Sequence, residues 1–153
     1  MPGPADLDIF PMTVADLDAV LAIEQASFNT PWKREHFEAE LTKQHSFPFV
    51  AWCNGDVVGY VCLMSLFEEA QILDIAVRPD QRGRGFALAL MEFAEAIARQ
   101  HGAEILALEV RASSTPAITL YERCGFVRTG VRPRYYDGRE DAVLMEKNLK
   151  ETH

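Results

Sequence analysis

Residues 73–87 read LDIAVRPDQRGRGFA, and this stretch decides the fold of the chain. A strand predicted over 70–77 runs into a loop that carries two glycines and three arginines. The loop leads directly into a helical pattern from about Arg84 to His101, which Gly102 ends. A strand followed by such a loop and a long helix indicates a βαβ unit, and therefore a mixed α/β sheet.

The hydrophobic period outside this stretch predicts the other elements. A period of two on either side of Asn54-Gly55 predicts a hairpin with a type I′ turn. The predicted order is a strand at 7–12, helices at 13–26 and 33–43, strands at 49–52, 57–66 and 70–77, a helix at 84–101, a strand at 104–110, a helix at 116–124, and closing strands at 126–136 and 142–149. We therefore expect one domain, residues 1–153, with a mostly antiparallel sheet and one βαβ crossover.

Three local patterns predict burial. Thr13 and Asp16 are spaced as a capping signal for the first helix, whose apolar stripe would begin at Val14. The helix after the loop carries apolar residues at helical spacing from Leu88 onward. The nearly continuous apolar run 104–110 is typical of a strand buried on both faces.

Charge and composition exclude several classes of protein. The 153 residues include 15 Lys and Arg against 23 Asp and Glu, a formal charge of −8, and 48% are hydrophobic. This is an ordinary globular composition, and its acidic balance disfavours general nucleic-acid binding, which needs clustered Lys and Arg. Three widely spaced cysteines suggest neither a disulfide framework nor a zinc site, and we expect them in the core. No secretory signal and no apolar run of about 18 residues is visible, so a cytoplasmic protein without a membrane span is expected.

The loop of residues 78–85 is a candidate anion site. Free backbone N–H groups and the positive end of a helix dipole meet at such a turn, and Arg82 and Arg84 could add charge-assisted contacts. No Lys followed by Ser or Thr is present, and the third glycine of G-x-G-x-x-G is missing, so neither a P-loop nor a dinucleotide fingerprint fits. On composition alone, a surface turn with solvated arginines remains the alternative.

With these residues in place, the chain resembles the GNAT N-acetyltransferases. Arg82-x-x-Gly85-x-Ala87, after Ile75-Ala76-Val77, is similar to the family's [RQ]-x-x-G-x-[GA] loop, which holds the pyrophosphate of acetyl-CoA. The resemblance covers nearly the whole chain and narrows to the RimI subfamily, the ribosomal-protein-alanine N-acetyltransferases. The segments that carry the narrower likeness are Leu108–Ser113, Ala117-Ile118, Leu120–Glu122, Gly125-Phe126, Tyr135-Tyr136 and Gly138–Ala142.

The resemblance implies acetyl-CoA as the acetyl donor, without a metal. It implies donor contacts from the strand end and the loop: Ile75, Ala76, Val77, Arg82, Gly83, Arg84, Gly85, Phe86, Ala87 and Leu88. Ser114 stands where the subfamily commonly has an Asn that contacts the donor. Its shorter hydroxyl either keeps that contact or caps the helix that begins near Pro116.

Two residues are the candidate catalytic groups. A peptide α-amine has a pKa of about 8, so it must lose a proton before it attacks the thioester. Glu109 lies at the carboxyl end of a predicted strand, where open α/β sheets bind ligands, and the resemblance implies that it is the general base. An ion pair with Arg111 is the structural alternative. The resemblance implies that Tyr121 is the general acid for the departing thiolate, whereas its spacing on the helix also suits a core residue.

The acceptor side is the least determined by the sequence. Tyr135, Tyr136 and Glu140 could line the acceptor groove, or the tyrosines could simply favour a strand. Glu68 either occupies a solvated turn or faces a cationic acceptor. An acidic protein could steer a basic ribosomal protein toward such a groove.

The resulting prediction is direct acetyl transfer to the N-terminal alanine of a ribosomal protein. No cysteine stands in a recognisable nucleophile arrangement, which disfavours a covalent intermediate. The alternatives are acetylation of a lysine side chain or a small amine, or a non-catalytic acyl-CoA-binding module. Expected partners are acetyl-CoA and a basic protein or peptide N-terminus, with no nucleic acid or membrane, and the chain is expected to be a monomer or weak dimer.

Overall fold

The computed structural model of the chain describes residues 3–136 and 138–150. A seven-stranded sheet of order β1-β2-β3-β4-β5-β7-β6 forms its centre. The strands are β1 (Asp8–Pro11), β2 (Ser46–Cys53), β3 (Asp56–Leu66), β4 (Glu69–Val77), β5 (Ile105–Arg111), β6 (Val127–Tyr136) and β7 (Glu140–Asn148), and the helices are α1 (Leu17–Ser27), α2 (Arg34–Thr42), α3 (Phe86–Gln100) and α4 (Thr115–Arg123). The predicted element order and the mixed α/β sheet are confirmed.

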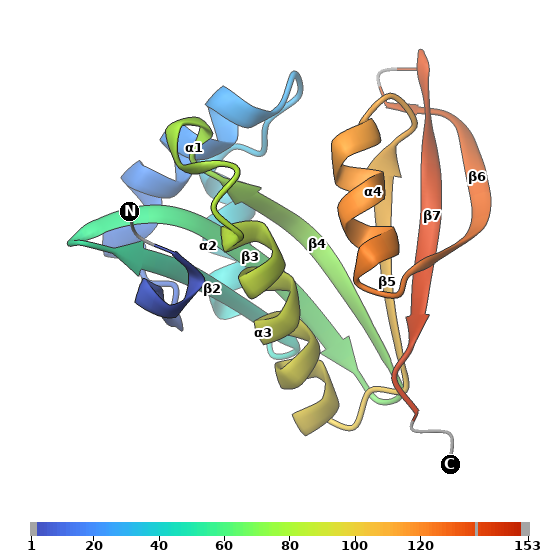
Figure 1. Cartoon of the computed structure of the whole chain (residues 1–153), viewed down its shortest axis with the longest axis horizontal. Coiled ribbons are helices and arrows are strands. Elements are labelled where there is room, and N and C mark those ends of the chain that lie inside the picture. The colour runs from blue at the N-terminus through green and yellow to red at the C-terminus, as the bar shows by residue number, and fades with distance from the viewer. Residues whose placement is uncertain (1–2, 137, 151–153) are drawn as a thin grey trace.

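The helices cover the two faces of the sheet unequally (Figure 1). Buried side chains of α3 and α4, such as Leu90 and Ile118, belong to one hydrophobic cluster. Buried side chains of α1 and α2, such as Val20 and Phe37, belong to another on the opposite face. The second cluster packs on the strands up to β4, so β5 to β7 are covered by helices on one face.

The strands β4 and β5 form the parallel pair that the βαβ crossover requires, with α3 as the connection. Their pairing runs from Glu69 opposite Ile105 to Ile72 opposite Leu108. Beyond these residues the two strands separate, as Figure 1 shows. The sheet is therefore split at the carboxyl ends of its two central strands.

A β-bulge in β4 lies where this separation begins. Cys62 of β3 is opposite Asp74 and Leu63 is opposite Ile72, so Leu73 is an extra residue in β4. Bulges bend a strand and increase its local twist, and they commonly redirect side chains next to a functional site. After the bulge, Asp74 and Ala76 are on the face of the sheet that α1 covers.

Some local predictions were wrong in detail. The first helix begins with a 3₁₀ turn (Val14–Asp16), and Val14 is 66% exposed rather than part of the apolar stripe. The capping pair itself is present, because the Thr13 N–H donates to Asp16 at 2.8 Å. Leu88 is likewise 40% exposed, since the buried stripe of α3 follows Phe86, Leu90, Met91, Ala94 and Ala98.

The prediction that residues 104–110 are buried on both faces was also wrong. Leu106, Leu108 and Val110 are buried, whereas the alternate residues of β5 are partly exposed. The physical reason is that α1 and α2 cover the sheet only as far as β4, which leaves one face of β5 without a covering helix. Glu109 is on this open face, so the same feature that defeats the burial prediction places its carboxylate at a cleft.

Candidate active site

A cleft of about 630 Å³ opens where β4 and β5 separate. Its residues come from α1 and the segment after it, the ends of β4 and β5, the starts of α3 and α4, and the β6–β7 hairpin. The site residues predicted from the sequence that line it are Ile75, Ala76, Val77, Arg82, Ala87, Glu109, Ser114, Tyr121, Tyr136 and Glu140. Segments that lie up to about a hundred positions apart in the chain therefore meet at one cavity.

The loop between β4 and α3 has the backbone of an anion site. Gly83 and Gly85 have φ values of +80° and +83°, in the left-handed region that glycine adopts at little cost. Gly85 is the N-cap of α3, and its carbonyl accepts the first helical hydrogen bond, from the Ala89 N–H at 3.1 Å. The N–H groups of the first helical turn therefore have no partner within the helix and are available to an anion.

The N-terminal 3₁₀ turn (Pro4–Asp6) packs against this loop. A Cβ atom placed on Gly85 would lie 2.9 Å from Cγ of Pro4, closer than real Cβ contacts allow. The same construction at Gly83 meets nothing within 4 Å. Glycine is thus required at position 85 by the backbone conformation and by the close approach of Pro4. At position 83 it is required by the backbone conformation alone.

The three arginines of the loop have different environments. Arg82 lines the cleft, where its guanidinium donates to the Val77 carbonyl at 3.2 Å and to the Ser27 hydroxyl at 3.0 Å. Arg78 pairs with Asp80 at 2.6 Å, and this hydrogen bond lowers the pKa of the Asp80 carboxyl. Arg84 donates to the side chain of Gln81 at 2.9 Å. Arg82 is therefore the member of this group placed to meet an anion in the cleft.

Glu109 forms an ion pair, but not with the partner that the sequence suggested. Its carboxylate lies 3.1 Å from the guanidinium of Arg132 in β6. Arg111 instead donates to Glu140 at 3.2 Å and to the hydroxyl of Thr30 at 2.7 Å. Arg132 is more than half exposed, so Glu109 keeps its place at the cleft surface while its charge is partly balanced.

Tyr121 has the burial of a core residue and also the position at the cleft that a general acid needs. It is only 8% exposed and packs beside Phe126, as a core residue would, yet it also lines the cleft. Burial, reinforced by the nearby Asp74 carboxyl, raises the pKa of the Tyr121 phenol. The phenol therefore keeps its proton throughout the neutral range, and it can donate a hydrogen bond to a leaving group in the cleft.

The β6–β7 hairpin supplies Tyr136 and Glu140 to the cleft mouth. The Arg111 guanidinium lies 4.3 Å from the centre of the Tyr136 ring, and burial raises the pKa of that phenol to about 12. The Glu140 carboxylate accepts from the Ser113 N–H at 2.8 Å, and hydrogen bonding from the side chain and then the backbone of Ser113 lowers the pKa of Glu140. Arg111 therefore connects the two sides of the cleft mouth, because it donates to Glu140 of the β6–β7 hairpin and to Thr30 of the segment after α1.

Other predicted site residues lie elsewhere. Tyr135 is exposed outside the cleft, where the Arg132 guanidinium stacks over its ring at 5.2 Å. Glu68 occupies the β3–β4 turn, at the opposite end of β4 from Val77, so the structure does not bring it to the cleft. Gly83, Arg84, Gly85 and Phe86 form the loop and helix start without lining the cleft. Ser114, in contrast, lines the cleft and is the N-cap residue of α4, but its side chain makes no capping hydrogen bond.

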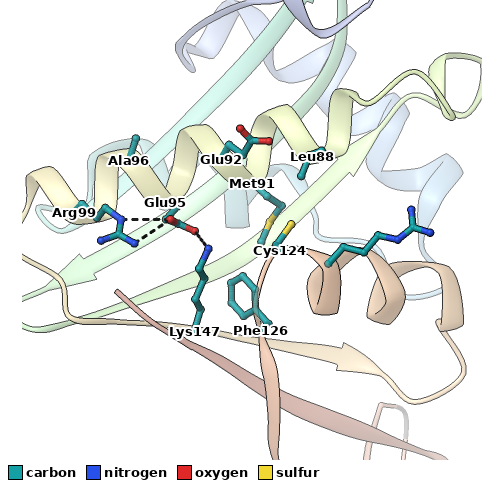
Figure 2. A pocket seen from close by; sticks show the side chains of 10 residues that line it. Leu88, Met91, Glu92, Glu95, Ala96, Arg99, Cys124, Phe126 and Lys147 are labelled. Carbon is teal, nitrogen blue, oxygen red and sulfur yellow. Dashed lines mark hydrogen bonds and ion pairs between the residues drawn. The ribbon is translucent and has the colours of Figure 1, made fainter. Parts of the chain in front are cut away.

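Leu88 lines a second, smaller hollow of about 350 Å³ between α3 and the end of α4 (Figure 2). Glu95 crosses this hollow to Lys147 at 2.6 Å and also pairs with Arg99 at 3.2 Å. Three charged groups of the hollow, Glu95, Arg99 and Lys147, are thus paired with one another. Leu88 therefore does not line the cleft. The residues at the other end of the predicted donor segment, Ile75–Val77, do line it.

The sequence reasoning missed one wall of the cleft. This wall consists of Glu24, Ser27, Phe28, Asn29, Thr30 and Trp32, with Asp74 of β4 beside it. The sequence patterns place most of these residues only between the predicted helices 13–26 and 33–43. A glutamate within the apolar stripe of α1 was an available signal, because buried carboxylates are rare unless they are bonded.

Within residues 3–136 and 138–150, no group of three or more His, Cys, Asp or Glu side chains is arranged to hold a metal ion. In the same ranges, no helix has both the length and the apolar character needed to cross a membrane. Cys53 and Cys62 are buried, as predicted, and Cys124 is half-buried.

The cleft opens between two separating parallel strands, beside a glycine-arginine loop at a helix N-terminus, and its lining includes the Glu109 carboxylate and the Tyr121 phenol. This arrangement suits an N-acyltransferase of the acyl-CoA-dependent class. The chain belongs to the acetyltransferase (GNAT) family, whose model matches residues 17–126. It is an N-acetyltransferase, and this family uses acetyl-CoA as the donor.

The chain is similar to the [ribosomal protein bS18]-alanine N-acetyltransferase of Escherichia coli (strain K12), with 35% identity over 88% of this chain and 92% of the relative. It is 33% identical to an N-alpha-acetyltransferase of Saccharolobus solfataricus, over 88% of each chain. Among solved structures, the ribosomal-protein-S18-alanine N-acetyltransferase from Escherichia coli superposes with a TM-score of 0.87 over 96% of both chains, at 33% identity. These similarities confirm the predicted family and its ribosomal-protein subfamily.

Proposed function

We propose that the protein transfers the acetyl group of acetyl-CoA to the α-amine of an N-terminal alanine on a ribosomal protein. The observation that carries this proposal is the meeting of Glu109 and Tyr121, identified from separate motifs, in one cleft beside the end of β4. The bS18-alanine N-acetyltransferases named above support the choice of acceptor. A ribosomal acceptor implies that the enzyme works in the cytoplasm.

On the donor side, the loop and the end of β4 would hold acetyl-CoA. The N–H groups of the first turn of α3, with Arg82, would bind the pyrophosphate, since both present positive charge at one point. Backbone groups of residues 75–77 would hold the acetyl end, with a main-chain N–H placed to stabilise the oxyanion. Tyr121 would donate its hydroxyl proton to the departing thiolate.

On the acceptor side, Glu109 would take the proton that the amine must lose, directly or through a water. The pKa of an α-amine is about 8, whereas that of a lysine side chain is about 10.4, so the α-amine needs less help from a carboxylate. The missed wall of residues 24–32 would hold the first residues of the acceptor opposite Glu109. The Arg111 bridge to Thr30 and Glu140 would keep the mouth narrow.

The proposal is tested by incubating the protein with acetyl-CoA and a panel of peptides, with product masses and fragment ions measured by mass spectrometry. The panel contains an alanine-first peptide, the same peptide with its α-amine blocked and an internal lysine, and small amines. Acetylation confined to the free α-amine of alanine supports the proposal. Turnover only on lysine or on a small amine would overturn it, and stoichiometric acetyl-CoA binding without any turnover would indicate a binding module.

Replacing Tyr121 with Phe should lower kcat by about tenfold or more, because the leaving thiolate loses its proton donor while the ring keeps its packing. The dissociation constant of acetyl-CoA, measured by calorimetry, should stay within about twofold of the wild type. Tyr135→Phe is the matched control, since Tyr135 is exposed outside the cleft. Equal rates for wild type and Tyr121→Phe would remove Tyr121 from the mechanism.

Replacing Arg111 with Lys should raise the KM for the acceptor peptide about fivefold or more and leave the KM for acetyl-CoA unchanged. A lysine keeps the charge, but it cannot reach Thr30 and Glu140 at once as the planar guanidinium does. Arg128→Lys, on the exposed part of β6, is the control. An unchanged acceptor KM in Arg111→Lys would show that the bridge does not shape the mouth.

A further inference from the structure

The strongest unexplained feature is a pair of neighbouring carboxyl groups in the cleft wall: Glu24 is buried, and Asp74 is half-buried with one oxygen buried. Glu24 of α1 is 1% exposed, and Asp74 of β4 lies within hydrogen-bonding reach of it. Both line the cleft. Two adjacent carboxylates in a low dielectric repel each other strongly, so the pair needs a proton or a cation to be stable.

Glu24 already accepts hydrogen bonds on both of its oxygens. The buried hydroxyl of Tyr60 in β3 donates to Oε1, and the backbone N–H of Trp32 donates to Oε2 at 2.8 Å. This is the pattern of a carboxylate, which has only acceptors to offer. Glu24 thereby joins α1 to β3 and fixes the chain at Trp32, the far end of the missed wall.

Asp74 is in the opposite situation. Its Oδ2 atom is buried and has no hydrogen-bond partner among the described residues. An orphaned carboxylate oxygen in the interior is costly, whereas a protonated carboxyl group has an O–H to donate. The acceptor within its reach is Glu24, so one proton on Asp74 removes both the orphaned oxygen and the repulsion.

We propose that Asp74 is a neutral carboxylic acid whose O–H donates a hydrogen bond to the Glu24 carboxylate, and that this bond fixes residues 27–32 as the acceptor wall of the cleft. Asp74 and Glu24 are then positioning residues for acetyl transfer. This part of the inference rests on the proposed function, whereas the protonation of Asp74 does not.

The surroundings of Asp74 agree with this protonation. Burial, and then the charge and hydrogen bond of Glu24, raise the pKa of Asp74 well above its ordinary range. The titratable groups that face it are Glu24 from α1, Tyr60 and Cys62 from β3, and Tyr121 from α4, with Glu40 of α2 acting on Cys62. Arg82 lines the same cleft, but its guanidinium is bonded to Val77 and Ser27.

The protonation has a consequence for stability that needs no substrate. In the unfolded chain Asp74 ionises near pH 4, whereas in the folded protein it holds its proton to a much higher pH. Between these two pKa values the folded state binds the extra proton, so this group lowers the free energy of unfolding as pH rises. Asp74→Asn, which cannot ionise, removes this loss.

The test compares Asp74→Asn and Asp74→Leu with the wild type, with Asp56→Asn at an exposed position of β3 as control. The melting temperature of Asp74→Asn, relative to wild type, should increase by about 3 °C or more between pH 4.5 and pH 8. The same difference for Asp56→Asn should stay constant. A constant difference for Asp74→Asn would overturn the protonation, whatever the enzyme acetylates.

The positioning role is measured with the alanine-first peptide at pH 7. Asp74→Asn, whose amide can replace the O–H donor, should keep an acceptor KM within about twofold of the wild type, and Asp74→Leu should raise it about fivefold or more. The KM for acetyl-CoA should not change in either variant. Equal acceptor KM values in Asp74→Leu and wild type, or equal increases in both variants, would overturn the role. Failure of the wild type to acetylate any α-amine would instead overturn the proposed function and, with it, this role.

Discussion

Glu109→Gln should lower kcat by about a hundredfold or more, the largest catalytic effect expected in this protein. A glutamine has nearly the shape of glutamate, and its oxygen can still accept from Arg132, but it cannot take a proton from the acceptor amine. The dissociation constant of acetyl-CoA should be unchanged, because Glu109 lies on the acceptor side of the cleft. Stopped-time assays with the alanine-first peptide, combined with calorimetry of donor binding, measure both quantities.

Glu104→Gln is the matched control for this experiment. Glu104 precedes the same strand at its other end, where its carboxylate pairs with Lys150 at 3.2 Å. Its replacement should leave kcat within about twofold of the wild type. A wild-type kcat for Glu109→Gln would exclude Glu109 as the base and leave its ion pair with Arg132 as its main role.

Gly85→Ala should weaken acetyl-CoA binding by about tenfold or more, the largest effect expected on the donor side. The new Cβ would be in the left-handed region, at a cost of about 1–2 kcal/mol, and would also meet Pro4 at 2.9 Å. Relief of that contact must move the 3₁₀ turn or the start of α3, whose N–H groups form the anion site. Calorimetric titration with acetyl-CoA measures the loss.

Gly83→Ala separates the two causes. It has the same backbone conformation, but its Cβ meets nothing within 4 Å, so it should suffer the strain without the collision. A Gly85→Ala, Pro4→Ala double variant should recover part of the donor affinity, because the atom in the way has been removed. If Gly83→Ala and Gly85→Ala weaken acetyl-CoA binding equally, the contact with Pro4 does not contribute to the loss of affinity.

Much of the fold could be predicted from local patterns. The element order follows from periods of two and 3.6 and from glycine stops, such as Gly102 with its φ of +84°. The burial of β5 could not be predicted, since a run of apolar residues does not tell whether helices cover both faces of the strand. The split between β4 and β5 is likewise a tertiary feature, and it opens the cleft that Glu109 lines.

The candidate catalytic residues and the candidate donor loop could be predicted from the sequence, because each lies in a short, distinctive segment. The proposed acceptor wall could not be predicted, because its residues line the cleft only once α1 packs against β4. Asp74 stands within the quoted stretch itself, yet its significance depends on Glu24, 50 positions earlier in the chain. Of the two alternatives for Glu68, its place in the β3–β4 turn favours the solvated turn, since the length of β4 separates it from the cleft.

The early end of the β4–β5 pairing also separates the segments that would bind the donor from those that would bind the acceptor. In the proposed function, the donor side of the cleft comes mostly from one continuous segment, 72–87, whereas the acceptor side is assembled from three separate ones near residues 24–32, 109–111 and 136–140. Because β4 and β5 are not paired beyond Ile72 and Leu108, no strand pairing ties the end of β4 to the end of β5, and the acceptor segments can be redesigned as exchangeable parts. Grafting them between related acetyltransferases offers a route to new amine specificity with the donor machinery left intact.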